Sequence, residues 1–343
     1  MNLNDFDYEL PQELIAQTPV EPRDHSRLLV YNKASDKVET KHFYDIVDYL
    51  NKGDVVVINN TKVMQARLHS SDGKFEILLC KCIDEEKHTW EILLKNAKKL
   101  QVGGVVTFGD GKNVVVGTLD SKDVEAGTAV MSFNRDPEPF GEMPLPQYIK
   151  DSEHAKAETN RYNTVYASDD KKGSAAAPTA GLHWTPELME KVRKKGVVFC
   201  EILLHVGIGT FRPVKVENIK DHKMHAEYYE VSQAAADMIN NARKNGNRII
   251  CVGTTSVRTL ESVYAKFGDI RADAADTSIY IYPGFKYNVT DALITNFHLP
   301  KSTLVMLVSA YIGREKTLEL YNFAVREKFR FFSFGDACLF MLK

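Results

Sequence analysis

Continuously apolar runs recur along the chain and alternate with segments whose apolar positions follow a helical spacing. Runs typical of parallel strands covered on both faces occupy residues 54–60 (DVVVINN), 197–204 (VVFCEILL) and 248–253 (RIICVG). Apolar positions at three–four spacing, which predict amphipathic helices, occupy residues 42–51, 186–195 and 232–245. We also expect a strand and turn at residues 278–284 (SIYIYPG). This alternation predicts an α/β domain.

A stretch of different character interrupts the alternation between about residues 67 and 135. It contains short strand-like runs separated by turn signals such as Asp72-Gly73, Gly103-Gly104 and Asp110-Gly111. About five or six short strands with no helix between them indicate a small antiparallel barrel or sandwich. The sequence therefore predicts a mixed-sheet α/β domain with an inserted small antiparallel β-barrel domain. The expected boundaries are 1–62 and 151–343 for the α/β domain, with the active site in its second part, and 63–150 for the barrel.

Composition narrows the class of protein. The chain has 343 residues, of which 44% are hydrophobic and 26% charged, values that are ordinary for a soluble globular protein. A formal net charge of −2 excludes binding to nucleic acid through bulk positive charge, but it is compatible with local basic patches.

The cysteines and the apolar runs of the chain indicate its cellular compartment. The five cysteines are few, odd in number and scattered, which favours a reducing compartment. Cys80 and Cys82 have no further ligands at zinc spacing, so we expect no metal. The N-terminus lacks the apolar region of a signal peptide, and the longest apolar run, residues 304–312, is too short to cross a bilayer. We therefore expect a cytoplasmic protein that does not associate with membranes.

Candidate chemistry is concentrated at residues 175–211. A Pro-Thr-Ala-Gly loop containing Thr179 and Gly181 leads into His183, and the strand 197–204 delivers His205 at its carboxyl end. Ligands of α/β folds bind at the carboxyl ends of strands. Gly181, together with Gly207 and Gly209 after His205, allows close approach of a ligand to the backbone, and Thr210 is a further substrate-binding candidate.

Other candidates lie at further strand–loop junctions. They are His225 and Glu227 in DHKMHAEYYEVS, and Asn296, His298 and Lys301 in DALITNFHLPKST. Histidine at such a junction is often an acid, a base or an orienting donor. Two anion sites are also expected. One is the strand–turn–helix junction with Thr254, Thr255, Ser256 and Arg258, and the other is Arg23 on a proline-rich loop.

Two familiar patterns fit these residues poorly. The string LLHVGIGTF is similar to the first motif of class I methyltransferases, but Phe211 replaces the third glycine and Arg212-Pro213 stands where a helix should begin. His222 and His225 with Glu227 suggest a metal site, but the spacing of hydrolytic zinc helices, with a glutamate between the two histidines, is absent.

Several longer motifs stand out along the chain: EPRDHSRLLV, AAPTAGLHWTPEL, LLHVGIGTFRPV, HKMHAEYYEV, IICVGTTSVRTLES, IYPG and DALITNFHLPKSTLVMLVSA. Together they resemble the S-adenosylmethionine:tRNA ribosyltransferase-isomerase family of queuosine biosynthesis. They occur in the family's order and cover both ends of the chain. Trp184, where the family usually has phenylalanine, and Cys338 are small departures, and neither removes a candidate catalytic group.

The resemblance implies a reaction and its partners. The ribosyl part of S-adenosylmethionine is transferred to 7-aminomethyl-7-deazaguanine at the wobble position of a tRNA with a GUN anticodon. The sugar rearranges to an epoxycyclopentane, adenine and methionine leave, and the product is epoxyqueuosine-tRNA. S-adenosylmethionine is then a co-substrate and no cofactor is needed. The family also implies a monomer with an α/β domain and an inserted barrel.

Roles for the candidates follow as hypotheses. The sulfonium acidifies the adjacent 5′ carbon, and the expected base is His205 or His225 with Glu227 as the orienting partner. His183 or His298 is expected to protonate the departing adenine. The turn Thr254–Ser256 with Arg258 is expected to hold the methionine carboxylate or an RNA phosphate, and Lys301 the other of these two groups. The alternatives are a methyltransferase and an RNA-binding module whose barrel grips tRNA.

Overall fold

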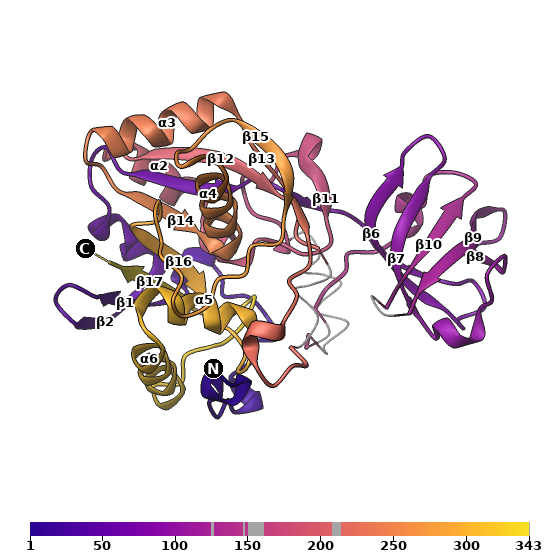
Figure 1. Cartoon of the computed structure of the whole chain (residues 1–343), viewed down its shortest axis with the longest axis horizontal. Helices are drawn as coiled ribbons and strands as arrows, with labels where there is room; N and C mark the ends of the chain where they lie inside the picture. The colour runs from indigo at the N-terminus through magenta and orange to yellow at the C-terminus, as the bar shows by residue number, and fades with distance from the viewer. Residues whose placement is uncertain (125–126, 147, 150–160, 208–213, 343) are drawn as a thin grey trace.

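The computed structural model describes the whole chain except residues 125–126, 147, 150–160, 208–213 and 343. Figure 1 shows a large α/β domain beside a smaller all-β domain, with thin connections between them. The fold class predicted from the sequence, a mixed-sheet α/β domain with an inserted antiparallel barrel, is confirmed. The strands of the small domain all lie within the range 63–150 that was expected for the insertion.

The α/β domain is built on a nine-stranded sheet of order β15-β13-β12-β3-β14-β16-β17-β1-β2. Its four central strands, β12, β3, β14 and β16, are parallel, whereas β13 and β17 run antiparallel to their neighbours β12 and β16. The strands are β1 (Arg27–Asn32), β2 (Lys37–His42), β3 (Val55–Asn59), β12 (Val198–Leu204), β13 (Glu227–Val231), β14 (Ile249–Val252), β15 (Asp273–Thr277), β16 (Ala292–Asn296) and β17 (Ala337–Met341).

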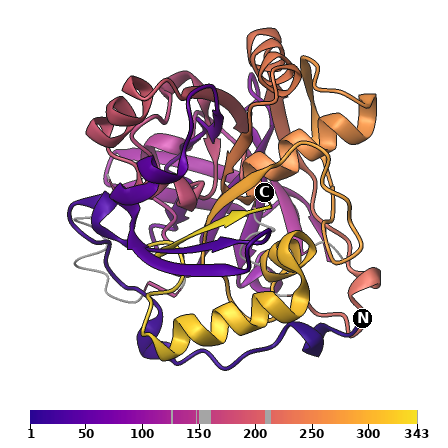
Figure 2. The ribbon, with the colours of Figure 1, turned by 90° about the vertical axis from the view of Figure 1, so that its left-hand side faces the viewer.

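Helices cover both faces of this sheet, as Figure 2 shows from the side away from the barrel. The α-helices are α2 (Pro186–Lys194), α3 (Gln233–Lys244), α4 (Gly253–Phe267), α5 (Thr303–Ile312) and α6 (Arg314–Arg326). The 3-10 helices of this domain include η1 (Leu3–Phe6), η2 (Gln12–Leu14), η3 (Arg23–His25), η4 (Phe43–Tyr49), η8 (Asp169–Lys171), η9 (Thr179–His183) and η11 (Ile219–Asp221).

Alternate residues of the central strands enter two separate cores. Val55 and Val57 of β3 pack with α3, α4, α5 and α6, whereas Val56 and Ile58 pack with η4, η9 and α2. This is why the run 54–60 is apolar throughout and shows no polar alternation. The helix starts expected from the sequence are also present, since Thr185 caps α2 by accepting a hydrogen bond from the Leu188 N–H at 3.1 Å.

The small domain is a six-stranded antiparallel sheet of order β5-β6-β7-β10-β9-β8. Its strands are β5 (Arg67–His69), β6 (Glu76–Asp84), β7 (Thr89–Lys95), β8 (Val105–Asp110), β9 (Asn113–Asp123) and β10 (Thr128–Phe133). A bridge between Ser70 and Phe108 brings the first and last strands together and nearly closes the barrel. Phe108, Leu119 and Met131 are fully buried inside it. Two further 3-10 helices, η5 (Ala97–Lys99) and η6 (Glu138–Phe140), flank these strands.

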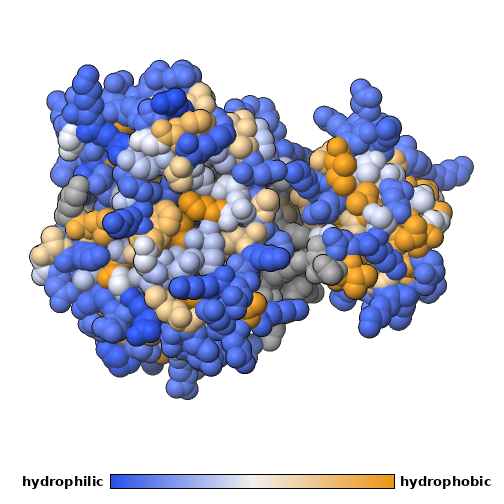
Figure 3. Space-filling view, in the orientation of Figure 1, coloured by the Kyte–Doolittle hydropathy of each residue, from blue (hydrophilic) through white to orange (hydrophobic). Residues whose placement is uncertain are grey.

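The face of the molecule in Figure 3 is largely polar, and apolar side chains are visible on the barrel. Ile83, Val102 and Val105 of this domain are each more than half exposed. Two short strands, β4 (Lys62–Val63) and β11 (Lys172–Ser174), pair with each other where the chain leaves the α/β domain. An ion pair between Lys81 of β6 and Asp276 of β15 links the two domains at 3.3 Å.

Three local predictions differ from the structure. The helix expected at residues 42–51 is the shorter 3-10 helix η4, which still buries Phe43, Ile46 and Val47. The strand expected at 278–284 is wrong, because this segment packs Ile281 into the core without joining the sheet ladder. The strand lies just before it at β15, whose polar sequence DAADT suits an exposed sheet edge and carries no apolar pattern. Strands β2 and β17 were not predicted.

Candidate active site

The carboxyl ends of the four parallel central strands meet at one edge of the sheet. At this edge β3 ends at Asn59, β12 leads into His205, β14 leads into Gly253 and β16 ends at Asn296. The first residue of β13, Glu227, lies at the same edge because β13 runs antiparallel to β12. The fold thus gathers residues that are far apart in the sequence, at the place where α/β folds bind ligands.

His205 is held at the end of β12 by a chain of hydroxyl groups. Its Nδ1 lies 2.9 Å from Thr61 Oγ1, which lies 2.8 Å from Ser174 Oγ. The imidazole stacks on Tyr228 with ring centroids 5.9 Å apart. Gly173 also lies against the ring, where a Cβ atom would come within 2.8 Å of it. The ring therefore has little freedom to turn.

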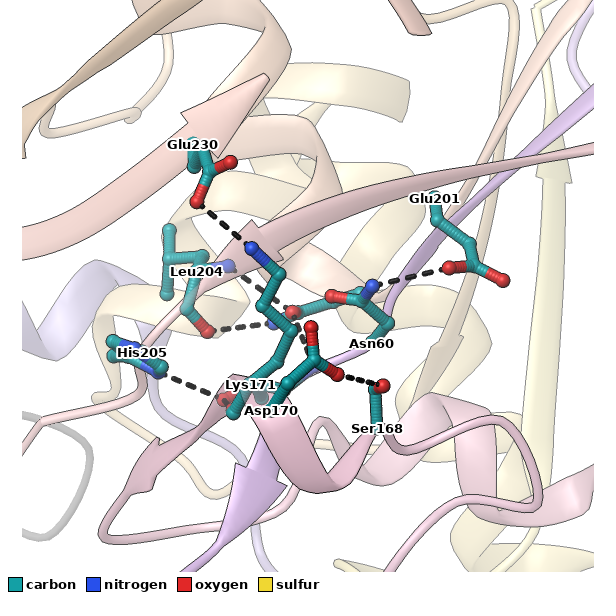
Figure 4. Close-up of polar contacts among 10 residues, drawn as sticks. Asn60, Ser168, Asp170, Lys171, Glu201, Leu204, His205 and Glu230 are labelled. Atoms are coloured by element: carbon teal, nitrogen blue, oxygen red, sulfur yellow. Dashed lines mark hydrogen bonds and ion pairs between the residues drawn. The ribbon is translucent and has the colours of Figure 1, made fainter. Parts of the chain in front are cut away.

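Charged groups near His205 act in opposite directions on its pKa. Burial lowers the pKa below the usual 6.5, the positive charge of Lys171 lowers it further, and Glu230 raises it. Lys171 and Glu230 form an ion pair at 3.2 Å beside the ring, as Figure 4 shows at the ends of β12 and β13. The neutral, proton-accepting form of His205 is therefore favoured at pH 7.

Glu227 is buried and its carboxylate is bound on both oxygens. Oε2 pairs with the guanidinium of Arg258, and Oε1 accepts a hydrogen bond from the Gly207 N–H at 2.8 Å. Among the described residues, Nε and Nη2 of Arg258 have no hydrogen-bond partner although both are buried. Glu227 thus orients Arg258 and the backbone of Gly207, while the partner of His205 Nδ1 is Thr61. His225 lies close enough to His222 to lower its pKa.

The N-terminus of α4 follows β14 directly and presents polar groups at the same edge. Gly253 has a φ of +85°, which favours glycine, and no side chain caps the helix. The buried hydroxyl of Thr255 has no hydrogen-bond partner in the described part of the chain, whereas Ser256 Oγ donates to Val252 O at 2.8 Å. Thr254 is half-buried beside them. The geometry suits an anion, with Thr255 and the first amides as donors.

His183 is buried at the other end of this edge, next to β16. Asn296 Nδ2 donates to its Nε2 at 3.1 Å, so Nδ1 carries the hydrogen and donates to Ser26 Oγ at 2.8 Å. Burial lowers the pKa of His183 to about 3, with further lowering by Arg330 and Arg23. The ring stacks on Phe43 at a centroid distance of 5.1 Å. His183 is therefore a neutral, rigidly held group.

A small cavity opens beside His183. Its lining includes Arg23, Ser26, Arg161 and Ser333. Arg23 donates to the backbone carbonyl of Asn163 at 2.8 Å, which fixes its guanidinium at the cavity wall. The expected anion-binding loop residue Arg23 is thus placed next to a candidate catalytic histidine, an arrangement that its sequence position alone did not indicate.

The remaining candidates lie in different surroundings. His298 is buried with its pKa lowered to about 3, and its Nε2 lies 2.9 Å from Thr295 Oγ1. Lys301 has a φ of +58° and pairs with Asp7 at 2.9 Å, so its ammonium group faces the N-terminal segment.

The expected ligand-binding loop also contains Thr179 and Gly181. They belong to η9, which packs against β16 and α4. A Cβ at Gly181 would lie 2.7 Å from Thr164 Cγ2 and closer still to the hydroxyl of Tyr166, so this glycine is required by packing. Gly209 and Thr210 lie outside the described residues.

Sequence reasoning missed three hydroxyl residues of this edge, Ser26, Thr61 and Ser174. Each contacts a candidate histidine directly or through one further hydroxyl. A signal existed for Thr61, because it follows the buried strand at residues 54–60. Ser26 and Ser174 lie in loops in the sequence and become site residues only through tertiary contacts.

A family model and a solved structure are similar to this chain over nearly its whole length. The model of a protein family described as queuosine biosynthesis protein matches residues 3–340. The chain belongs to this family. Among solved structures, the S-adenosylmethionine tRNA ribosyltransferase from Thermotoga maritima is 37% identical in sequence, with a TM-score of 0.57. That match covers 98% of this chain and 100% of the other. The family expected from the sequence motifs is thus confirmed.

Two further findings concern metal binding and membrane insertion. Among the described residues, no group of three or more His, Cys, Asp or Glu side chains is arranged to hold a metal ion, and this includes His222, His225 and Glu227. Within the same residues, no helix is both long enough and apolar enough to span a bilayer.

Proposed function

We propose that this protein transfers and isomerises the ribosyl moiety of S-adenosylmethionine onto 7-aminomethyl-7-deazaguanine at the wobble position of tRNA. The products are epoxyqueuosine-tRNA, adenine and methionine. The observation that carries the proposal is membership of the queuosine biosynthesis family together with 37% identity, over nearly the whole chain, to a protein named S-adenosylmethionine tRNA ribosyltransferase. The tRNA has a GUN anticodon, and the enzyme acts as a cytoplasmic monomer without a metal or resident cofactor.

His205 or His225 removes a proton from the 5′ carbon next to the sulfonium. His205 is the stronger candidate because its ring packs against Tyr228 and Gly173, and burial and the charge of Lys171 lower its pKa. A base with a pKa below the working pH is unprotonated when substrate arrives. Glu227 contributes by orienting Arg258, which has two donors without a partner among the described residues and could offer them to a carboxylate or phosphate.

His183 or His298 is the proposed group that protonates the departing adenine; this requires that the histidine first gain a proton, because burial lowers the pKa of each to about 3. His183 is favoured by its position at a cavity that Arg23 also lines. The N-terminus of α4, with Thr254 and Thr255, is the proposed site for the methionine carboxylate. Lys301 takes part only if its ion pair with Asp7 opens, since the two side chains lie 2.9 Å apart.

The test is turnover of an anticodon stem-loop RNA that carries 7-aminomethyl-7-deazaguanine, with S-adenosylmethionine, followed by mass spectrometry. Release of adenine with the mass of the epoxyqueuosine product supports the proposal. Release of S-adenosylhomocysteine identifies a methyltransferase, and binding without turnover identifies an RNA-binding module. His205→Ala and His225→Ala test the base, with His42→Asn on the exposed edge strand β2 as the control. Near-normal turnover in both alanine variants contradicts the assignment of the base.

A further inference from the structure

Thr61 lies at the centre of a small hydrogen-bond network beside His205. Four contacts converge on two hydroxyl groups, those of Thr61 and Ser174, and both residues are completely buried. Val206 N–H donates to Ser174 Oγ at 2.8 Å, and Ser174 Oγ lies 2.8 Å from Thr61 Oγ1. Thr61 Oγ1 lies 2.9 Å from His205 Nδ1 and 3.4 Å from the carbonyl oxygen of Lys171.

Each hydroxyl has one hydrogen to donate and two lone pairs to accept with. The carbonyl oxygen of Lys171 can only accept. A hydrogen bond between it and Thr61 therefore uses the single hydroxyl hydrogen of Thr61. The remaining two contacts of Thr61 must then be ones in which it accepts, from Ser174 O–H and from His205 Nδ1–H. This is the one arrangement in which all four contacts are hydrogen bonds. The opposite arrangement, with Thr61 donating to Nδ1, leaves the Lys171 carbonyl without this donor.

We propose that Thr61 and Ser174 are positioning residues that hold His205 in the Nδ1–H tautomer, so that Nε2 is the proton-accepting atom. The inference rests on the proposed function in taking His205 as the base. When the C–H bond at the 5′ carbon breaks, the proton passes to Nε2 and the electron pair stays on the carbon next to the sulfonium. The resulting imidazolium keeps its Nδ1–H bond to Thr61, so the network needs no rearrangement. A neutral hydroxyl orients the ring without adding negative charge.

Gly173 packs against the same ring. A Cβ atom there would lie 2.8 Å from both Cε1 and Nε2 of His205 and 3.1 Å from Nδ1, so glycine at this position leaves room for the ring. Met64 N–H holds the segment in place by donating to the Ser174 backbone oxygen at 3.1 Å. Gly173 therefore makes space for the imidazole, while Thr61 and Ser174 act on its orientation through hydrogen bonds.

The direct test is nuclear magnetic resonance of the full chain labelled with ¹⁵N-histidine, with the His205 signals identified by their loss in His205→Ala. We expect Nδ1 protonated and Nε2 unprotonated at pH 7. Thr61→Val, which keeps the side-chain shape but removes the acceptor, is expected to lose this tautomer preference, and Thr61→Ser to retain it. Ser174→Ala provides a second variant if Thr61→Val does not fold. Finding Nε2–H in the unmodified protein, or an unchanged tautomer in Thr61→Val, overturns the proposal.

Turnover separates this inference from the proposed function. Thr61→Val is expected to lower kcat about 10-fold with little change in KM, since orientation of a base contributes only part of general-base catalysis. Thr61→Ser is expected to restore kcat. If His205 is the Nδ1–H tautomer as expected, but neither the parent protein nor any variant releases adenine, the proposed reaction fails and the positioning role stands. If adenine is released and Thr61→Val has the parent kcat and pH profile, the positioning role fails and the reaction stands.

Discussion

The buried carboxylate of Glu227 forms an ion pair with the guanidinium of Arg258, and each side chain is less than a tenth exposed. The two residues come from the first position of β13 and the second turn of α4, which meet at the carboxyl edge of the sheet. The pair also holds the backbone after His205, because Glu227 accepts the Gly207 N–H. A change at either residue thus affects both stability and the shape of the candidate site.

Removal of one member of this pair is expected to be costly. Glu227→Met or Arg258→Met leaves the other group buried without its partner, which lowers the free energy of unfolding by about 3–5 kcal/mol. The double variant Glu227→Met/Arg258→Met should lose less than the sum of the single changes. Urea denaturation measures all of these. The control is Glu190→Gln, which breaks an exposed pair with Lys194 and should change stability by less than about 1 kcal/mol. Additive losses in the double variant contradict the coupling.

The pH dependence of turnover should respond to the charges beside His205. The base must be neutral, so kcat/KM falls as pH drops through the pKa of His205. Lys171 lowers this pKa, so Lys171→Met should raise it and move the acid limb to higher pH. Glu230→Gln removes the group that raises the pKa and should move the limb to lower pH. Lys172→Met is the control, since Lys172 pairs with Glu138 instead. An acid limb that stays in place in both variants shows that another group titrates.

Stability should fall in acid because of His183 and His298. Burial lowers the pKa of each from 6.5 to about 3 in the folded protein. The unfolded chain therefore binds more protons between these values. The free energy of unfolding is expected to decline as pH falls from 6.5 towards 3, by about 1.4 kcal/mol per pH unit for each histidine.

Denaturant midpoints at pH 7, 6 and 5 measure this slope. In His298→Gln the slope of the free energy of unfolding against pH should be shallower by the contribution of one histidine. The stability of this variant at pH 7 is also lower, because the contact with Thr295 is lost. His88→Asn is the control. His88 is half-buried in the barrel and has a φ of +47°, which asparagine tolerates. Equal slopes in His298→Gln and the parent protein contradict the prediction.

Two glycines of the site should respond differently to alanine. At Gly181 a Cβ would overlap Tyr166 and Thr164, so Gly181→Ala should cost about 1–3 kcal/mol of stability. At Gly207 the nearest atom of the described residues to a Cβ would be Glu227 Cγ at 3.7 Å, so Gly207→Ala should leave stability nearly unchanged. If a ligand approaches the Gly207 backbone, the same variant should weaken S-adenosylmethionine binding, which calorimetry measures. Unchanged binding in Gly207→Ala removes this glycine from the ligand site.

Strong local patterns made much of the fold predictable. The central strands are apolar throughout because both faces are covered, and their lengths and flanking turns identified β3, β12 and β14. The barrel strands were separated by Gly-containing turns, which made the insertion visible. Prediction failed at β15, where a polar edge strand has no periodic signal, and at residues 278–284, whose aromatic side chains pack in the core without a strand.

The sequence by itself determined the fold class, the family motifs and the histidines of the candidate site, because these depend on residue type and local spacing. The tertiary structure alone decided which residues control those histidines. Thr61 and His205 are 144 positions apart, and Ser26 and His183 are 157 apart, yet each pair lies within hydrogen-bonding distance. Strand order and register bring the members of each pair together, and no local sequence pattern predicts these contacts. The tautomer of His205 depends on those contacts and was therefore beyond the reach of the sequence.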